Sequence, residues 1–527
     1  MRVVCCCTAF LLLILIPKAC EGGNILVYPS EGSHWINMEI LLKALHSRGH
    51  NITILRSSKS WYIKDNSSYY SAFTVPVENT LDQTFITRIV AEIIEFERGA
   101  LPLISFLHMS VGMFGTFIDA HKGVGAVVTA MMDDSELMRK MKDSKFDLLL
   151  ADPCWGGGVI LAKYLNLPLV YNVRWLIAAE SHFSIAPSPL SYIPITGAGN
   201  TDKMTFLQRV TNMLLHIITQ IQNDLLVRLV YQKLTDKYLG PGHDFNELMI
   251  AADIWLMRVD FVFEYPRPTM PNVVYIGGFQ CKPAKPLPQH LEDFVQSSGD
   301  HGFILMSLGT FVTELPSDIT NEIAAAFAKL PQKVIWKYKG DRPANLGNNT
   351  LLVDWMPQND LLGHPKIKLF VAHGGTNGVQ EAIYHGVPFV GIPVFFDQHD
   401  NLLRLKERGG GKILTLATVD KDYNFLKAIE EVLNDPSYRT NMQRLSRLHR
   451  DKPVKPLDNA LFWIEFVMRH KGAAHLKAQS YRMPWYSYHS VDVVLFLAGA
   501  MLLVLLTTFY LIRCIYTGMC KRKVKHD

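Results

Sequence analysis

The chain contains 527 residues, of which 49% are apolar and 19% are charged. This length is too great for one ordinary core and fits two or three packed domains. The net charge of +5 is spread thinly and the body contains no long basic run, so the composition gives nucleic-acid binding little support.

The first 23 residues have the order of features found in a signal peptide. Arg2 precedes an apolar run over residues 3–16, and Pro17 and mostly small residues lead to Gly23. A charged start, a short apolar region and a cleavage zone predict that residues 1–23 are removed. A buried first strand is the alternative, although residues 24–30 supply a β-rich run of their own.

Strands and helices alternate along the first half. Apolar β-rich runs predict strands at residues 24–30, 51–56, 146–151 and 168–173, and a helix at 35–47. Two longer regions, 81–142 and 204–253, are helical in pattern. Their apolar residues are expected to form core, and both regions could also wall a ligand cavity.

A Pro-rich linker is predicted at residues 280–300, after which the alternation restarts. The candidate strands are 302–308, 334–338, 351–353, 369–372, 388–393 and 412–416, and the candidate helices are 319–329, 378–384 and 402–408. Two successive series predict an α/β protein with two doubly wound parallel sheets. Ligands bind outside the carboxyl ends of such strands, so two facing domains would form a two-substrate cleft.

Residues 493–512 carry no charge and are long enough to span a bilayer as a helix. Trp485, Tyr486 and Tyr488 precede this segment as an interfacial aromatic belt would, and basic residues follow it. Positive charge marks the cytosolic side. We therefore expect a single-pass type I protein whose body is lumenal.

The cytosolic tail is then short, residues 513–527. It ends Lys523-Val524-Lys525-His526-Asp527, which resembles the dilysine retrieval signal of endoplasmic-reticulum membrane proteins. Plain stop-transfer charges are the alternative.

Cysteine usage is consistent with a body that has no disulfide framework. Of eight cysteines, only Cys154 and Cys281 lie between the predicted signal and the predicted span. Two such residues form neither a framework nor a Cys-based metal site. Three sequons, at Asn51, Asn66 and Asn348, could accept glycans if the body is lumenal.

Residues 355–401 carry a candidate ligand site. The strand at 369–372 runs into a glycine-rich turn, residues 373–378, and then a helix. Glycines let the backbone approach a ligand, and free N–H groups at a helix start attract phosphate. Trp355 offers a plane for stacking, and Gln358 offers a paired donor and acceptor. Asp397 and Gln398 follow a strand end, where they could bind sugar hydroxyls. Each feature alone is more often structural.

A second candidate pair is His34 and Asp152. His34 follows the first strand, and an imidazole can remove a proton from an attacking hydroxyl near neutral pH. Asp152 ends the strand at 146–151 and could hold the other ring nitrogen. A packed histidine and a helix-capping aspartate are the alternatives.

The order and spacing of WMPQNDLLGHPKIKLFVAHGGTNGVQEAIYHGVPFVGIPVFFDQHDN resemble the signature of the UDP-glycosyltransferase family, and of its vertebrate UDP-glucuronosyltransferases in particular. The similarity extends from Gly32-Ser33-His34-Trp35, through residues 457–465, to the terminal anchor. It implies the GT-B fold, two facing Rossmann-like domains. Residues 24–285 would then bind the acceptor and 286–450 the UDP-sugar, with a returning helix and membrane-proximal segment at 451–492.

The resemblance also implies roles for single residues of the donor side. Trp355 would stack on uracil, with Gln358 hydrogen-bonding nearby, and Glu381 would accept from the ribose hydroxyls. The residues that would hold the diphosphate are Ser307, His373, Thr376, Asn377 and Gly378. The transferred sugar would contact Asp397 and Gln398. No divalent metal is expected, because the helix start and His373 can neutralise the leaving UDP.

On the acceptor side, the resemblance makes His34 and Asp152 a dyad that acts in an inverting displacement. After Asp152 the chain reads Pro153-Cys154-Trp155-Gly156-Gly157-Gly158, where many members of the family place extra residues between the Asp and a Pro-Cys pair. The three glycines do not predict a dinucleotide-binding site.

The implied activity is transfer of glucuronic acid from UDP-glucuronate to lipophilic acceptors such as phenols, steroids and xenobiotics. A carboxylate donor needs a cation, and Arg258 is the candidate, with a surface arginine as the alternative. A UDP-glucose or UDP-xylose donor on the same fold remains open, as does a non-catalytic UDP-sugar-binding partner subunit. Family members often form dimers, so a homo- or heterodimer is possible.

Overall fold

The computed structural model describes residues 22–78, 83–98, 103–176, 180–312 and 315–523. Most of the predicted signal peptide, residues 1–21, lies outside this part of the chain. The chain divides into two compact units, Met1–Leu476 and Lys477–Asp527.

The first half of the larger unit is built on a seven-stranded parallel sheet with the strand order β3-β2-β1-β4-β5-β6-β7. The strands are β1 (Asn24–Tyr28), β2 (Asn51–Ser57), β3 (Ser71–Val75), β4 (Leu148–Ala151), β5 (Leu169–Val173), β6 (Ile254–Met257) and β7 (Val273–Tyr275). Strands β1, β4 and β5 are almost wholly buried apolar runs, as expected of strands covered on both faces. The four strands predicted here are confirmed.

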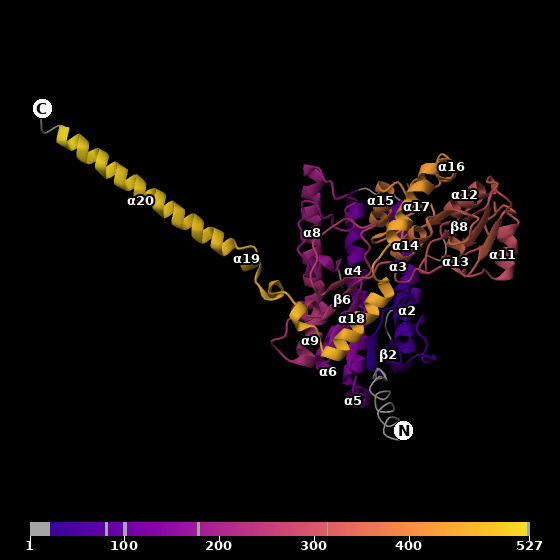
Figure 1. Cartoon of the computed structure of the whole chain (residues 1–527), viewed down its shortest axis with the longest axis horizontal. Coiled ribbons are helices and arrows are strands. Elements are labelled where there is room, and N and C mark those ends of the chain that lie inside the picture. Colours follow the sequence, from indigo (N-terminus) through magenta and orange to yellow (C-terminus); the bar gives the residue numbers. More distant parts are fainter. Residues whose placement is uncertain (1–21, 79–82, 99–102, 177–179, 313–314, 524–527) are drawn as a thin grey trace, which may run out of the picture. The chain divides into compact units, whose positions relative to one another are not determined.

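Helices connect these strands and cover the sheet (Figure 1). They are α2 (Ser33–Ser47), α3 (Gln83–Arg98), α4 (Leu103–Asp133), α5 (Ser135–Asp143), α6 (Gly157–Leu165), α7 (His182–Ile185), α8 (Phe206–Leu226), the π-helix η1 (Val227–Tyr231), α9 (Gln232–Leu239) and α10 (Phe245–Ile250). The two long helical regions of the prediction are therefore confirmed as several successive helices each.

A second parallel sheet has six strands in the order β10-β9-β8-β11-β12-β13. The strands are β8 (Phe303–Ser307), β9 (Lys333–Lys337), β10 (Thr350–Val353), β11 (Ile367–Ala372), β12 (Phe389–Gly391) and β13 (Gly411–Ile413). The helices of this half are α11 (Gln289–Gln296), which precedes β8; α12 (Ser317–Ala328), α13 (Gln358–Leu362), α14 (Thr376–His385) and α15 (Gln398–Glu407), which lie between strands; and α16 (Asn424–Asn434) and α17 (Pro436–Arg450), which follow β13. Both sheets are doubly wound, as predicted.

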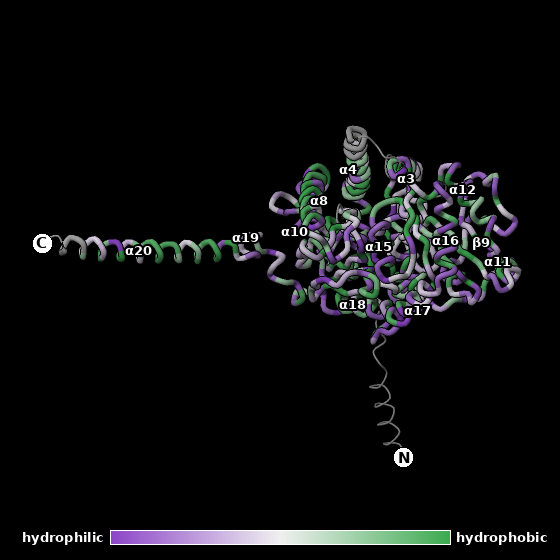
Figure 2. Tube along the Cα trace, turned by 90° about the horizontal axis from the view of Figure 1, so that it is seen from above, coloured by the Kyte–Doolittle hydropathy of each residue, from purple (hydrophilic) through white to green (hydrophobic). Residues whose placement is uncertain are grey.

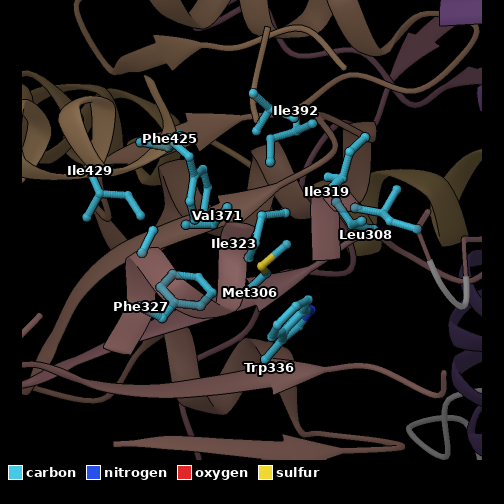
Figure 3. Packing of buried hydrophobic residues seen from close by; sticks show 14 of the residues in the cluster. Met306, Leu308, Ile319, Ile323, Phe327, Trp336, Val371, Ile392, Phe425 and Ile429 are labelled. Carbon is cyan, nitrogen blue, oxygen red and sulfur yellow. The ribbon is translucent and has the colours of Figure 1, made fainter. Parts of the chain in front are cut away.

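One face of the second sheet packs against α12 and α16. Met306 and Val371 project from central strands toward Ile323, Phe327 and Phe425 on these helices (Figure 3). Val90 and Ile94 of α3 join the same buried cluster, although α3 belongs to the first half of the chain. The second sheet is therefore packed partly by a helix that the first half supplies.

The structure corrects the linker predicted at residues 280–300. Residues 280–288 and 297–300 belong to no helix or strand, but α11 lies between them and buries Leu291 and Val295 in the core of the second half. Glu292 and Asp293 lie between these two apolar positions and lower the hydrophobicity of the segment, so its pattern did not predict a helix. Strands β3, β6 and β7 and helices α13, α16 and α17 were also not predicted.

After α17 the chain returns to the first sheet as α18 (Pro456–His470). Leu461, Ile464 and Val467 pack in one cluster with residues of α2 and the first sheet. The carboxylate of Glu465 accepts from Arg48 at 3.0 Å and lies 3.4 Å from His50. This placement confirms the returning helix.

The smaller unit consists of short helical turns, α19 (Trp485–Tyr488) and the long helix α20 (Val491–Lys523). Residues Val491–Met519 of α20 are long and apolar enough to cross a membrane, and α20 is green over most of its length in Figure 2. The helix extends past the predicted span at 493–512 and through Arg513, because nothing in residues 513–523 breaks a helix. Residues 524–527 lie outside the described part.

Candidate active site

The carboxyl ends of the parallel strands carry the predicted site residues. In the first sheet, β1 leads to His34 and β4 ends directly before Asp152. In the second sheet, β8 ends at Ser307 and β11 ends directly before His373. Strand ends of this kind are where doubly wound sheets bind ligands.

His34 and Asp152 form a pair. The imidazole Nδ1 lies 2.6 Å from Oδ2 of Asp152, with the His34 side chain 19% exposed and the Asp152 side chain 1% exposed. The other carboxylate oxygen accepts from the backbone N–H of Cys154 at 3.0 Å. This contact closes a local turn and does not cap α6, whose N-cap is Gly156 without a side-chain hydrogen bond, so the helix-capping alternative considered for Asp152 is wrong.

The charge state of Asp152 is set by its surroundings. Burial alone would raise the pKa of this carboxyl, but His34 and Arg258 outweigh burial and hold the pKa below its ordinary value. Asp152 is therefore an anion at neutral pH, and it orients the imidazole by accepting a hydrogen bond from Nδ1–H.

Arg258 follows β6 and is buried, so the surface alternative considered for it is wrong. Its guanidinium lies in the electrostatic field of Asp152 and Asp397, one from each half of the chain. Burial lowers its pKa, and its Nε is a buried donor without a hydrogen-bond acceptor among the described residues. A buried cation with an unused donor is suited to an anionic ligand.

The glycine-rich turn at residues 373–378 is called the donor turn below, because it is predicted to hold the diphosphate of the sugar donor. The ring of His373 fits against the backbone on two sides, since a Cβ added to Gly309 or Gly375 would lie 2.7 or 2.5 Å from its Nε2. These two positions therefore need glycine. Burial lowers the pKa of His373 to about 4, so the unliganded protein holds a neutral imidazole there at neutral pH. His373 can donate an N–H but does not bring the positive charge that the sequence suggested.

Two further groups border the donor turn. Ser307 is buried, and its hydroxyl accepts from the N–H of Gly309 at 3.3 Å. Lys337, at the end of β9, donates to the carbonyl of Gly309 at 2.8 Å. This lysine was not predicted from the sequence, although it lies near the end of a predicted strand.

The predicted base- and ribose-binding residues lie together. Trp355 is 71% exposed, which leaves its ring free to stack on a ligand. The side chain of Gln358, at the start of α13, donates to Glu381 of α14 at 2.6 Å. Burial raises the pKa of Glu381 to about 7. The alternative of a core tryptophan for Trp355 is wrong.

Asp397 and Gln398 occur where β12 leads into α15. Oδ2 of Asp397 accepts from Thr376 at 3.2 Å and from Asn401 at 2.9 Å, so it lies against the donor turn. Gln398 is buried and its carbonyl accepts from the backbone N–H groups of Val394 and Phe395 at 2.7 and 3.1 Å. Neither side chain is the surface group considered as an alternative.

Arg174 is the main residue that the sequence analysis missed. It follows β5 of the first sheet, yet its Nε donates to Asp397 at 2.8 Å and its Nη2 to Asn401 at 2.9 Å, both in the second half. Its Nη1 donates to Glu264 at 2.8 Å. All four side chains are buried. Burial would raise the pKa of Asp397, but Arg174 and Asn401 hold it below the ordinary value.

A second contact between the two halves lies beside the dyad. Asn37, one turn after His34 on α2, donates to Oδ1 of Asn377 at 2.8 Å. Its own carbonyl oxygen is buried and has no hydrogen-bond donor among the described residues. The helix that carries His34 is thereby attached to the donor turn. The next residue of the turn, Gly378, is buried against the ring of Phe370.

The remaining predictions concern metals, thiols and glycans. The described residues include no group of three or more His, Cys, Asp or Glu side chains arranged to hold a metal ion, and transfer without a metal stays a prediction. Cys154 and Cys281 are free thiols. The three sequon asparagines, Asn51, Asn66 and Asn348, are exposed, and their glycosylation stays a prediction.

Comparison with known proteins decides the family. Residues 23–526 match the family model described as UDP-glucoronosyl and UDP-glucosyl transferase. The chain belongs to this family. It is therefore a glycosyltransferase, and the resemblance seen in the sequence is confirmed.

Relatives match this glycosyltransferase over almost its whole length. UDP-glucuronosyltransferase 2B1 of Rattus norvegicus is 42% identical, with 98% of this chain and 99% of the relative covered. UDP-glucuronosyltransferase 2A2 of Mus musculus is 41% identical, with 96% of each covered.

Solved structures show the same fold at low identity. The calicheamicin glycosyltransferase CalG4 has a TM-score of 0.55 at 18% identity, covering 85% of this chain and 99% of its own. A UDP-glucosyltransferase from Polygonum tinctorium has a TM-score of 0.55 at 15% identity, with 85% and 99% covered. Together with the two doubly wound sheets, these matches confirm the GT-B fold.

Proposed function

We propose that this glycosyltransferase moves glucuronic acid from UDP-glucuronate to a hydroxyl group of small lipophilic acceptors such as phenols, steroids and xenobiotics. The names of relatives that are 41–42% identical support the sugar. The 2.6 Å contact between His34 and Asp152 carries the chemistry, because it places an oriented imidazole at the strand ends of the first sheet.

The acceptor hydroxyl would lose its proton to His34. Since Nδ1 faces Asp152, the unprotonated Nε2 is the atom that accepts this proton. The acceptor oxygen forms a bond to C1 of the sugar while the bond from C1 to the phosphate oxygen breaks, and UDP leaves with that electron pair. Attack from the face opposite UDP inverts the anomeric centre. Asp152 stabilises the imidazolium that results.

The UDP-sugar would be bound by residues of the second half, with different residues contacting the base, the ribose, the diphosphate and the sugar. Trp355 would stack on uracil, Gln358 and Glu381 would hold the ribose, and Asp397 and Gln398 would contact the sugar hydroxyls. Charge developing on the leaving diphosphate would be stabilised by the N–H groups at the start of α14 and by a hydrogen bond from neutral His373. Lys337 would add positive charge nearby.

Arg258 would select glucuronate among the UDP-sugars. Its buried Nε is an unused donor, and a carboxylate would satisfy it with a charge-assisted hydrogen bond. Turnover of membranes that contain the protein should be measured with UDP-glucuronate, UDP-glucose and UDP-xylose, with EDTA present and absent. A preference for a neutral sugar would reject the glucuronate assignment, and loss of turnover in EDTA would reject transfer without a metal.

A non-catalytic UDP-sugar-binding subunit is the competing function. Loss of either dyad residue would have favoured it, and both are present and paired. Association with a second copy or with a relative stays a prediction.

We also propose that α20 crosses the endoplasmic-reticulum membrane with the larger unit in the lumen. The apolar length of Val491–Met519 and the exposed sequons support this topology. A glycosidase-sensitive mass shift that Asn51→Gln, Asn66→Gln and Asn348→Gln together abolish would agree with it. Protease access to the larger unit in sealed microsomes would contradict it.

A further inference from the structure

Asn37 of the first half bonds to the donor turn of the second half. Its Nδ2 donates to Oδ1 of Asn377 at 2.8 Å, although 340 positions separate the two residues in the sequence. Asn377 is the second residue of α14, so its side chain lies at the helix start where the diphosphate of the donor is proposed to bind. One amide of the donor turn is therefore held by a residue of the other half.

The two ends of a side-chain amide have opposite hydrogen-bonding roles. Its Nδ2 only donates and its Oδ1 only accepts. A diphosphate offers acceptor oxygens, so Asn377 can bind it only through Nδ2. Asn37 occupies Oδ1 of Asn377, and Nδ2 of Asn377 has no acceptor among the described residues. The contact with Asn37 thus leaves free the end of the amide that a diphosphate needs.

The surroundings of Asn37 are unfavourable for an amide in the folded protein. Asn37 is 1% exposed, and its Oδ1 has no hydrogen-bond donor among the described residues. A buried acceptor without a donor destabilises the folded state, and an apolar side chain of similar size would avoid this penalty. Stability alone therefore does not explain an amide at this position.

The start of α2 contacts the second half at another point as well. A Cβ added to Gly32, directly before α2, would overlap the ring of Phe311 in the segment that follows β8. His34 and Asn37 are three residues apart on α2 and therefore lie on one face of the helix. The helix that carries the proposed base is thus in contact with both segments that are proposed to hold the diphosphate.

We propose that Asn37 is a positioning residue for the donor, which holds the amide of Asn377 with Nδ2 toward the phosphate oxygens. The inference rests on the proposed donor site and adds a residue of the first half to it. Full affinity for the diphosphate then requires contact between the two halves. The same contact keeps the helix that carries His34 against the donor turn.

The test compares the binding of UDP and of uridine to the full-length protein in detergent, by calorimetry. Uridine has the base and the ribose but no diphosphate, so it depends on Trp355 and Glu381 and not on Asn377. Asn37→Ala should weaken UDP binding by about tenfold, because the charge-assisted hydrogen bond from Asn377 is no longer oriented. Uridine binding should stay unchanged.

Asn37→Asp has the same size as the natural side chain but cannot donate. Its carboxylate would accept from Nδ2 of Asn377, which turns Oδ1 of that amide toward the diphosphate and adds a like charge nearby. This variant should weaken UDP binding by about 100-fold and should again leave uridine binding unchanged. Because its size is conserved, it gives the same comparison if Asn37→Ala does not fold.

Asn172→Ala is the matched control. It also removes a buried amide whose Oδ1 has no donor among the described residues, but this amide contacts Met38 of the first half. Both ligands should bind to it as to the unmodified protein, and a selective loss of UDP binding in it would overturn the inference. Equal losses for UDP and uridine in the Asn37 variants would indicate a structural role and overturn it too, as would unchanged UDP binding.

A double variant tests whether Asn37 acts through Asn377. Asn377→Ala should itself weaken UDP binding, and the addition of Asn37→Ala should weaken it no further, because the amide that Asn37 positions is already absent. Losses that add would overturn the inference. None of these measurements uses sugar transfer. An unmodified protein that binds UDP but does not turn over UDP-glucuronate would therefore reject the proposed function and leave the role of Asn37 standing.

Discussion

Two histidines lie at the carboxyl ends of the two sheets, and they contact different groups. His34 is partly exposed and contacts the carboxylate of Asp152. The ring of His373 packs against the backbones of Gly309 and Gly375, and desolvation lowers its pKa to about 4. The same side chain can therefore accept a proton in one half and only donate a hydrogen bond in the other. The groups around each histidine therefore determine its role, and the residue type alone does not.

The largest expected effect separates these two roles. His34→Ala should lower kcat for hydroxyl acceptors by about 10³-fold or more, because the general base is removed. UDP affinity, measured by calorimetry or by fluorescence quenching of Trp355, should stay unchanged. His373→Ala should instead weaken UDP binding. If His34→Ala retained its turnover, or lost UDP binding as well, the two histidines would not differ in the proposed way.

The contacts that join the halves can be tested at Arg174. Arg174→Met leaves Asp397 and Glu264 buried without their main cation, and removing one member of such a network costs about 3–5 kcal/mol of stability. The donor KM should rise as well, because Asp397 loses the side chain that positions it. The unfolding midpoint and the donor KM of membranes measure the two effects.

Arg174→Lys is the matched variant for that test. It keeps the charge but cannot reach Asp397, Glu264 and Asn401 together, so it should recover stability in part and donor KM less. Unchanged donor KM in Arg174→Met would mean that the network only stabilises the fold.

Most of the fold, but only part of the site, could be predicted from the sequence. Strands β1, β4 and β11 end in apolar runs that polar residues follow closely, and this local pattern marks a strand end directly. Arg174 and Asp397 are far apart in the sequence, and nothing within either segment shows that they meet. Strand β6 was missed because its four residues follow a helical region without a turn signal.

Smaller effects are expected at Arg258, which lies between the two carboxylates Asp152 and Asp397. Arg258→Met removes the proposed partner of the donor carboxylate, so kcat/KM for UDP-glucuronate should fall by about 10- to 100-fold. UDP-glucose turnover should change less, and the ratio of the two rates is the measurement. An equal loss with both sugars would assign Arg258 to the orientation of Asp152.

The smallest effect is a difference in how stability depends on pH. His373 has a folded-state pKa below its ordinary 6.5, so its contribution to stability is present above 6.5 and is lost as the pH falls toward 4. Glu381 has a folded-state pKa raised from 4.5 to about 7, so its contribution is present below 4.5 and is lost as the pH rises toward 7. Between about 4.5 and 6.5 the two slopes oppose each other.

Glu381→Gln removes one of these slopes and keeps an acceptor for Gln358. The variant should therefore lose stability on acidification more steeply than the unmodified protein, by up to about 1.4 kcal/mol per pH unit. His373→Gln should shift the dependence in the opposite direction. Unfolding midpoints at pH 7 and pH 5 give both differences. If stability depended on pH in the same way in all three proteins, His373 would not be a neutral imidazole and Glu381 would not be a protonated carboxyl in this range. The contrast between His34 and His373 would then lose its electrostatic basis.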